Sequence, residues 1–127
     1  MTEKRAKGNA GESLVCEYLK DKGYIIAARN YTTRLGEIDI IAENRSLLAF
    51  VEVKTRTENG FILPREAVDK HKQRKIAAAA GEYVQKTCNS LTVRFDVAEV
   101  VISGNEKADM KINYIENAFL PEDMFWN

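Results

Sequence analysis

Two apolar stretches joined by a short polar segment constrain this chain more than any other feature. Residues 35–42 read LGEIDIIA, residues 47–56 read LLAFVEVKTR, and the tetrapeptide ENRS lies between them. Both stretches are rich in β-branched and large apolar residues, which favour strands, and the polar tetrapeptide is typical of a turn. The pattern therefore predicts an antiparallel hairpin rather than a helix.

Three ionisable side chains interrupt these apolar strands. Side chains alternate along a strand, so we expect Asp39 on the face of Ile41, with Ile38 on the other face, and Glu52 on the same face as Lys54. Opposed residues of an antiparallel pair have numbers with a constant sum, and an odd sum places Asp39 and Glu52 on the same side. Burying two like charges together costs several kcal/mol. The cluster therefore favours a metal site over a pair of salt bridges.

The alternative is an edge hairpin with one solvated face, since an Asp followed by Glu-x-Lys is common by chance. The apolar context argues against it, because charged residues are rarely buried in such strands unless they are paired or bind a metal.

The two stretches also resemble a known family. Residues 36–42, GEIDIIA, followed by residues 50–56, FVEVKTR, resemble the core of the restriction-endonuclease-like nuclease superfamily, whose signature is an Asp on one strand and a Glu-x-Lys on the next. More closely, the chain resembles the bacterial YraN-type family of predicted endonucleases, which are similar to archaeal Holliday-junction resolvases. This resemblance extends from residues 8–12, GNAGE, through residues 94–97, RFDV, to residues 117–119, NAF.

The resemblance implies a restriction-endonuclease-like α/β fold, with a central mixed sheet that contains an antiparallel meander and is flanked by helices. It also implies an endonuclease that hydrolyses phosphodiester bonds in DNA, including branched or junction DNA. Its catalytic residues would be Glu12, Asp39, Glu52 and Lys54. Oxygen ligands suit Mg²⁺ or Mn²⁺. Asp39, Glu52 and the main-chain carbonyl of Val53 would hold the ion, and Glu12 would reach it directly, through water or through a second ion.

The net charge of the chain is zero, with 19 basic and 19 acidic residues, so nucleic acid binding depends on local charge. Residues 64–75 hold five basic residues against two acidic ones, whereas residues 116–127 hold three acidic residues and no basic one. Candidate phosphate contacts are Arg34, Arg56, Lys70, Lys72, Arg74 and Lys75. The alternative for each is an ordinary solvated surface position.

Hydrophobic periodicity predicts helices at 5–22 and 64–86, with a break in the second helix allowed near Asp69, and strands at 24–30, 36–42, 46–55, 92–102 and 111–115. Gly23 is expected to end the first helix, and Arg94 and Asp96 can pair on one face of their strand. At 127 residues the chain supports one domain, 1–127.

The cysteines, the amino terminus and the lengths of the apolar runs bear on the compartment of the protein and on its partners. Its two cysteines lack metal-ligand spacing, its amino terminus does not resemble a secretory signal, and no apolar run approaches the roughly 18 to 20 residues of a membrane span. We expect a cytoplasmic protein that binds nucleic acid, with DNA favoured, and that has no membrane partner. Three alternatives stay open: a non-catalytic nucleic-acid-binding or assembly protein that keeps the fold, a nuclease for RNA, and a homodimeric assembly.

Overall fold

The computed structural model describes residues 3–58 and 68–120, with side chains from residue 9 onward. The chain forms, in order, α1 (Glu3–Asp21), β1 (Ile25–Thr32), β2 (Glu37–Glu43), β3 (Leu47–Thr57), α2 (Lys70–Thr87), β4 (Thr92–Ile102), the short 3₁₀ helix η2 (Lys107–Asp109) and β5 (Met110–Ile115). All five predicted strands are present, and η2 was not predicted.

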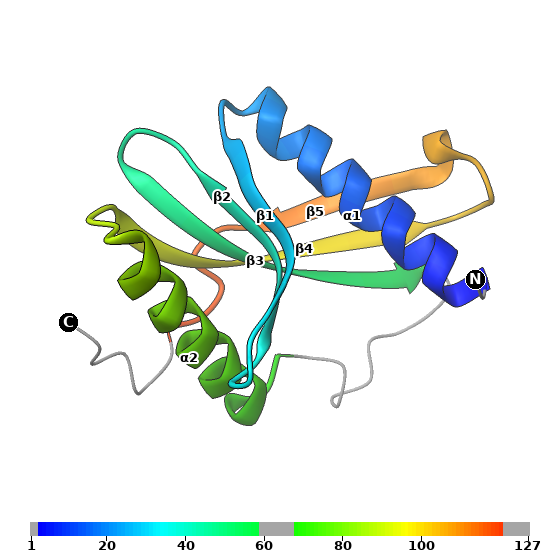
Figure 1. Cartoon of the computed structure of the whole chain (residues 1–127). Helices are drawn as coiled ribbons and strands as arrows, with labels where there is room; N and C mark the ends of the chain where they lie inside the picture. Colours follow the sequence, from blue (N-terminus) through cyan, green and yellow to red (C-terminus); the bar gives the residue numbers. More distant parts are fainter. Residues whose placement is uncertain (1–2, 59–67, 121–127) are drawn as a thin grey trace.

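The strands form one mixed sheet in the order β1-β2-β3-β4-β5 (Figure 1). β1, β2 and β3 make the predicted antiparallel meander, β3 and β4 run parallel, and β5 returns antiparallel to β4. A parallel pair needs a crossover, and α2 lies between β3 and β4 in the chain. This α/β arrangement is compatible with the restriction-endonuclease-like fold.

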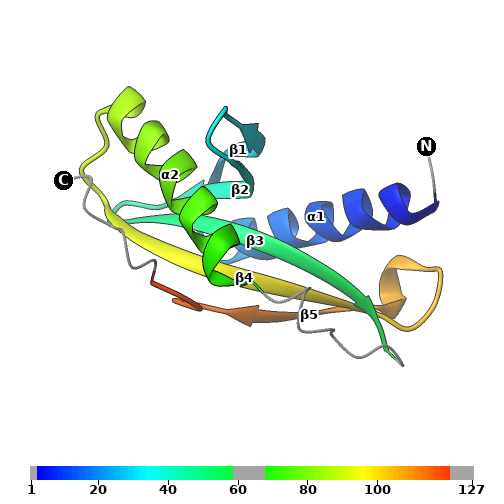
Figure 2. The same ribbon diagram turned by 90° about the horizontal axis from the view of Figure 1, so that it is seen from below.

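The two helices cover opposite faces of the sheet (Figures 1 and 2). α1 packs on one face through Val15, Cys16 and Leu19, against a cluster that includes Ile40, Ala49 and Val51. α2 packs on the other through Ile76, Ala79 and Ala80, against a cluster that includes Ile41, Phe50 and Phe95. Burial on both faces explains why the central strands are almost continuously apolar.

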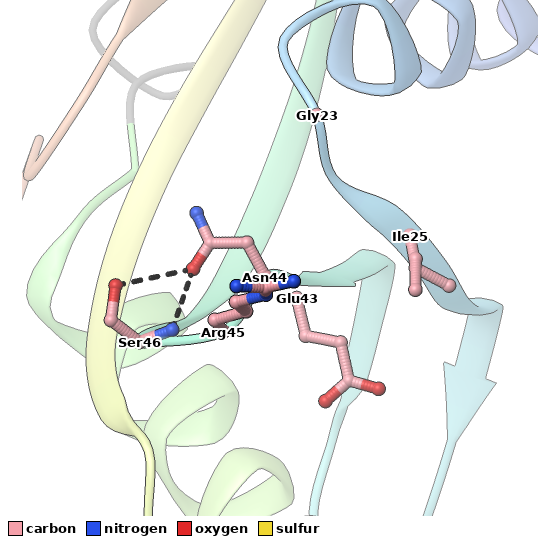
Figure 3. A pocket seen from close by; sticks show the side chains of 6 residues that line it. All are labelled: Gly23, Ile25, Glu43, Asn44, Arg45 and Ser46. Atoms are coloured by element: carbon pink, nitrogen blue, oxygen red, sulfur yellow. Dashed lines mark hydrogen bonds between the residues drawn. The ribbon is translucent and has the colours of Figure 1, made fainter.

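The turn between β2 and β3 is closed by Asn44. Its side-chain oxygen accepts a hydrogen bond from the backbone N–H of Ser46 at 3.0 Å (Figure 3). It also accepts from the backbone N–H of Leu47 at 2.9 Å. Asn favours such turns because its side chain replaces a backbone acceptor. The turn fixes a register in which Ile40 opposes Val51, and this register has the predicted odd sum.

Two expectations concern local structure. α2 begins at Lys70, after a break at Asp69, which adopts an extended conformation and whose side chain caps the helix by accepting from the N–H of Lys72. Val68 is not helical either, and Pro64 lies outside the described residues. Ile38 packs under α2 together with Ile41. Regular alternation would instead place Ile38 with Ile40 on the α1 face, so the predicted face of Ile38 was wrong.

The end of α1 follows the prediction. Gly23 has φ +95°, a conformation that favours glycine, and its N–H donates to the carbonyl of Lys20 while that of Tyr24 donates to Leu19. In the described part of the chain, no helix combines the length and apolar character needed to cross a bilayer.

Candidate functional site

The candidate site lies where β2 separates from β3. The backbone ladder between these strands ends at the pair Ile40 and Val51, one position before Asp39 would oppose Glu52. Beyond this pair, the side chain of Asp39 replaces a backbone acceptor, because its Oδ2 accepts the N–H of Val53 at 2.8 Å. This bond holds the carboxylate in the gap between the strands.

Glu52 lies on the α2 face of β3 and is almost completely buried. Its Oε1 lies 3.8 Å from the Nζ atom of Lys54 and 2.5 Å from that of Lys72, on the first turn of α2. Glu52 therefore has two ammonium partners in the metal-free chain. One comes from its own strand, and the other comes from the helix that covers it.

The pKa of Asp39 reflects its burial and the negative charge around it. Burial raises the pKa of this carboxyl group to about 7, and the charge of Glu52 adds to the shift while the hydrogen bond from Val53 opposes it. Glu12 contributes in the same direction as Glu52. A carboxyl group whose pKa is raised by burial and by neighbouring negative charge is typical of sites that bind a cation or transfer a proton.

The pKa values of Lys54 and Lys72 shift in opposite directions. Burial and the neighbouring ammonium of Lys72 lower the pKa of Lys54. Burial also opposes the charge on Lys72, but the hydrogen bond and charge of Glu52 outweigh it and raise the pKa of Lys72. Lys72 is thus the stronger cation partner of Glu52.

Glu12 belongs to α1, which packs on the other face of the sheet. Its carboxylate is mostly buried, and Oε1 lies 3.6 Å from Arg29 of β1 without accepting a hydrogen bond within the described residues. Across residues 9–58 and 68–120, no three acidic, histidine or cysteine side chains are arranged to hold one metal ion. The structure therefore does not bring Glu12 together with Asp39 and Glu52 as a single ligand set.

Asp39, Glu52 and Val53 nevertheless provide oxygens of the type that Mg²⁺ and Mn²⁺ prefer. In a strand, the N–H and C=O of one residue point to the same side, so the carbonyl of Val53 faces the gap into which its N–H donates. Mg²⁺ is commonly bound through only one or two carboxylates and keeps several waters. Two carboxylates and one carbonyl fit that pattern.

The predicted phosphate contacts fall into two groups. Arg34, Lys70, Arg74 and Lys75 are exposed. Arg56 is half-buried instead, and its guanidinium pairs with Glu99 of β4 at 3.2 Å. Lys72 pairs with Glu52, so the structure places it in the carboxylate cluster.

Gly36 sets the distance between β2 and α2. A Cβ atom added at Gly36 would lie 2.5 Å from the carbonyl oxygen of Lys75, so only glycine lets the backbone of the helix approach this closely. This contact holds the first turns of α2, which carry Lys72, beside the start of β2.

A separate hollow of about 620 Å³ lies at the turn end of the hairpin (Figure 3). Its lining includes Ile25, Glu43, Asn44 and Arg45. It contains one acidic and one basic side chain and is distinct from the Asp39 gap, which lies near the other end of β2.

Sequence reasoning missed two members of the site. Arg29, the partner of Glu12, had no distinguishing signal in the sequence. Lys72 was assigned to phosphate binding because it lies in a basic run, and its contact with Glu52 depends on which side of α2 faces β3.

Comparison with known proteins identifies relatives over most of the chain. Residues 11–100 match the model of "Uncharacterised protein family UPF0102", a span that includes the Glu12, Asp39, Glu52, Lys54 and Lys72 positions. A UPF0102 protein of Alkaliphilus metalliredigens is 47% identical over 116 residues, which cover 91% of this chain and 98% of that protein. One from Caldanaerobacter subterraneus is 43% identical over 117 residues, covering 91% and 96%. The chain belongs to the UPF0102 family.

Proposed function

We propose that this protein is a divalent-metal-dependent nuclease that cleaves phosphodiester bonds in DNA. One observation carries the proposal: the carboxylate of Asp39 lies in the gap where β2 leaves β3, near enough to Glu52 for their charges to interact, and the ammonium of Lys54 lies beside Glu52. The resemblance of residues 36–42 and 50–56 to restriction-endonuclease-like nucleases supports the same function, as does the compatible fold.

Asp39, Glu52 and the Val53 carbonyl would hold the ion, and Glu12 would act through water. When bound, Mg²⁺ or Mn²⁺ lowers the pKa of a coordinated water and neutralises charge on the phosphate. The chain's own residues orient the reacting groups: Asp39 is fixed by the N–H of Val53, and Glu52 is fixed on the central strand.

Lys54 has two candidate roles in this reaction. Its ammonium can stabilise the charge that develops on the phosphoryl oxygens, or it can orient the attacking water. Both roles place its main effect in the transition state. Arg34 and the exposed bases of α2, Lys70, Arg74 and Lys75, would contact the DNA backbone.

The test is a cleavage screen with linear, flapped, single-stranded and four-way-junction DNA, and with matched RNA, in Mg²⁺ and in Mn²⁺. Lys54→Ala should reduce cleavage of a susceptible DNA by about a hundredfold or more, with much smaller loss of DNA affinity. Lys86→Ala is a matched control, because it removes the same charge at the far end of α2, about 20 Å along the helix from Lys72. Cleavage that survives Lys54→Ala unchanged would refute the catalytic assignment.

A non-catalytic nucleic-acid-binding protein is the second candidate, and the ion pair between Lys72 and Glu52 favours it, because that pair already neutralises the site. This candidate predicts DNA binding that weakens with salt, with a salt dependence that flattens when Arg74 and Lys75 are neutralised. It also predicts no cleavage of any substrate in the screen. Preferential cleavage of RNA would instead support a nuclease whose substrate is RNA.

A further inference from the structure

Lys72 is placed by the backbone rather than by its own side chain. It lies in the first turn of α2, where its N–H donates to the capping oxygen of Asp69 at 2.8 Å. One turn later, the backbone of Lys75 packs directly on Gly36. The Cα position of Lys72 is therefore fixed beside the site, whereas its long side chain can rotate.

Lys72 and Lys54 share one oxygen atom of Glu52 but differ in their freedom to move. The side chain of Lys72 is 42% exposed, whereas that of Glu52 is 7% exposed. Lys54 belongs to the same strand as Glu52 and is 25% exposed. Lys72 can therefore turn outward into water, while Lys54 stays near the carboxylates.

A cation in the gap between Asp39 and Glu52 would compete with Lys72. Both need a Glu52 oxygen, and two positive charges held on one buried carboxylate repel each other. Asp39 accepts the N–H of Val53, and no ion pair between its carboxylate and an ammonium is seen within the described residues. Competition between the ion and Lys72 is therefore centred on Glu52.

We propose that Lys72 is an internal counter-ion that neutralises Glu52 in the metal-free protein and is displaced when a divalent ion binds, so that its ammonium becomes available to a DNA phosphate. This inference rests on the proposed function, because it assumes that Asp39 and Glu52 bind the ion. Lys72 is then a positioning residue that couples two binding events. Metal binding would release the ammonium of Lys72 from Glu52, and a DNA phosphate would then bind this ammonium. Each ligand would therefore raise the affinity of the protein for the other.

Titration of the metal-free protein with Mn²⁺, followed by calorimetry, tests the competition without requiring any cleavage. Lys72→Met should bind Mn²⁺ at least about fivefold more tightly than the parent, because the ion no longer displaces an ammonium. Lys75→Met is the matched control for net charge on the same helix, and it should stay within about twofold of the parent. Glu52→Gln should lose most of the binding.

The second measurement is the affinity for a short DNA duplex with and without Ca²⁺. In the parent, Ca²⁺ should strengthen DNA binding, and in Lys72→Met this gain should be smaller by about threefold or more. Lys75→Met should weaken DNA binding equally with and without Ca²⁺.

The outcomes separate this inference from the proposed function. If Lys72→Met binds Mn²⁺ no more tightly than Lys75→Met does, while Glu52→Gln still abolishes binding, the counter-ion role is wrong and the metal site stands. If neither the parent nor Lys72→Met binds Mn²⁺, both proposals fail. Binding by Lys72→Met alone would support the counter-ion role in its strongest form.

Discussion

Glu52 and Asp96 are both buried carboxylates on neighbouring strands, one register position apart and on opposite faces of the sheet. Their surroundings differ sharply. Both oxygens of Asp96 are filled by fixed donors: Oδ1 accepts from Arg94 and the N–H of Asn117, and Oδ2 accepts from Arg94 and the Tyr114 hydroxyl at 2.6 Å. Glu52 instead meets two flexible ammonium groups and lies close to a second acid, Asp39.

The comparison separates a carboxylate that holds the fold together from one that is suited to binding a cation. Asp96 links β4 to β5 and to the backbone at Asn117, and the hydrogen bond of Arg94 to Tyr24, just before β1, extends the network. Such a network stabilises a fold only when every member is satisfied. Around Asp39, by contrast, burial and the nearby charge of Glu52 raise the pKa of the carboxyl group, so its ionised form is not fully compensated.

The largest expected effect comes from breaking the Asp96 network. Asp96→Asn places an amide NH₂ against an N–H of Arg94 in either orientation of the side chain, and it leaves the guanidinium of Arg94 without its buried counter-charge. We expect a loss of about 3–5 kcal/mol in the free energy of unfolding, measured by urea denaturation. A loss below about 1 kcal/mol would remove the distinction drawn between Asp96 and Glu52.

The second prediction concerns pH and Asp39. The pKa of this group is about 7 in the folded chain, against about 3.9 in an unfolded one. The folded chain therefore binds the proton more tightly, and this contribution to stability is complete below about pH 4 and lost as the pH rises through 7.

Between these limits, the free energy of unfolding should fall by up to about 4 kcal/mol more in the parent than in Asp39→Asn, which has no proton to lose. Urea denaturation of both proteins across pH 4 to about 7.5 measures the difference. Parallel pH profiles would mean that folding does not raise the pKa of Asp39.

The smallest expected effect is that of Glu52→Gln in metal-free buffer. The substitution removes the pairing with Lys72 and Lys54, but it also relieves the repulsion from Asp39, and Lys72 can turn into solvent. These changes offset each other, so the free energy of unfolding should change by less than about 1 kcal/mol. A cost close to that of Asp96→Asn would mark Glu52 as a structural ion-pair partner.

Much of the fold could be predicted because local patterns specify it. Alternating apolar residues define the strands, Asn44 closes the turn, and Gly23 ends α1. The odd register that brings Asp39 to the level of Glu52 follows from the turn. The pairing of Arg94 with Asp96 was also predictable, because these two side chains lie on the same face of one strand.

Contacts between elements that are distant in the chain could not be predicted in this way. The pairing of Arg56 with Glu99 depends on the parallel alignment of β3 and β4, for which neither strand carries a turn signal. The contact of Lys72 with Glu52 depends on the rotation of α2, which Gly36 and the cap at Asp69 fix only in three dimensions. The sequence therefore predicted the carboxylates of the site and Lys54, but it did not predict the pairing of Lys72 with Glu52 or of Arg29 with Glu12.

The parallel pairing of β3 with β4 also affects the order in which charges meet during folding. The β2–β3 hairpin is local and can form early, whereas the crossover through α2 closes a much longer loop and is expected later. Asp39 and Glu52 would then approach each other before the ammonium of Lys72 arrives. A nascent hairpin in this chain carries unbalanced negative charge, so mild acid or a divalent cation should speed the early step of folding.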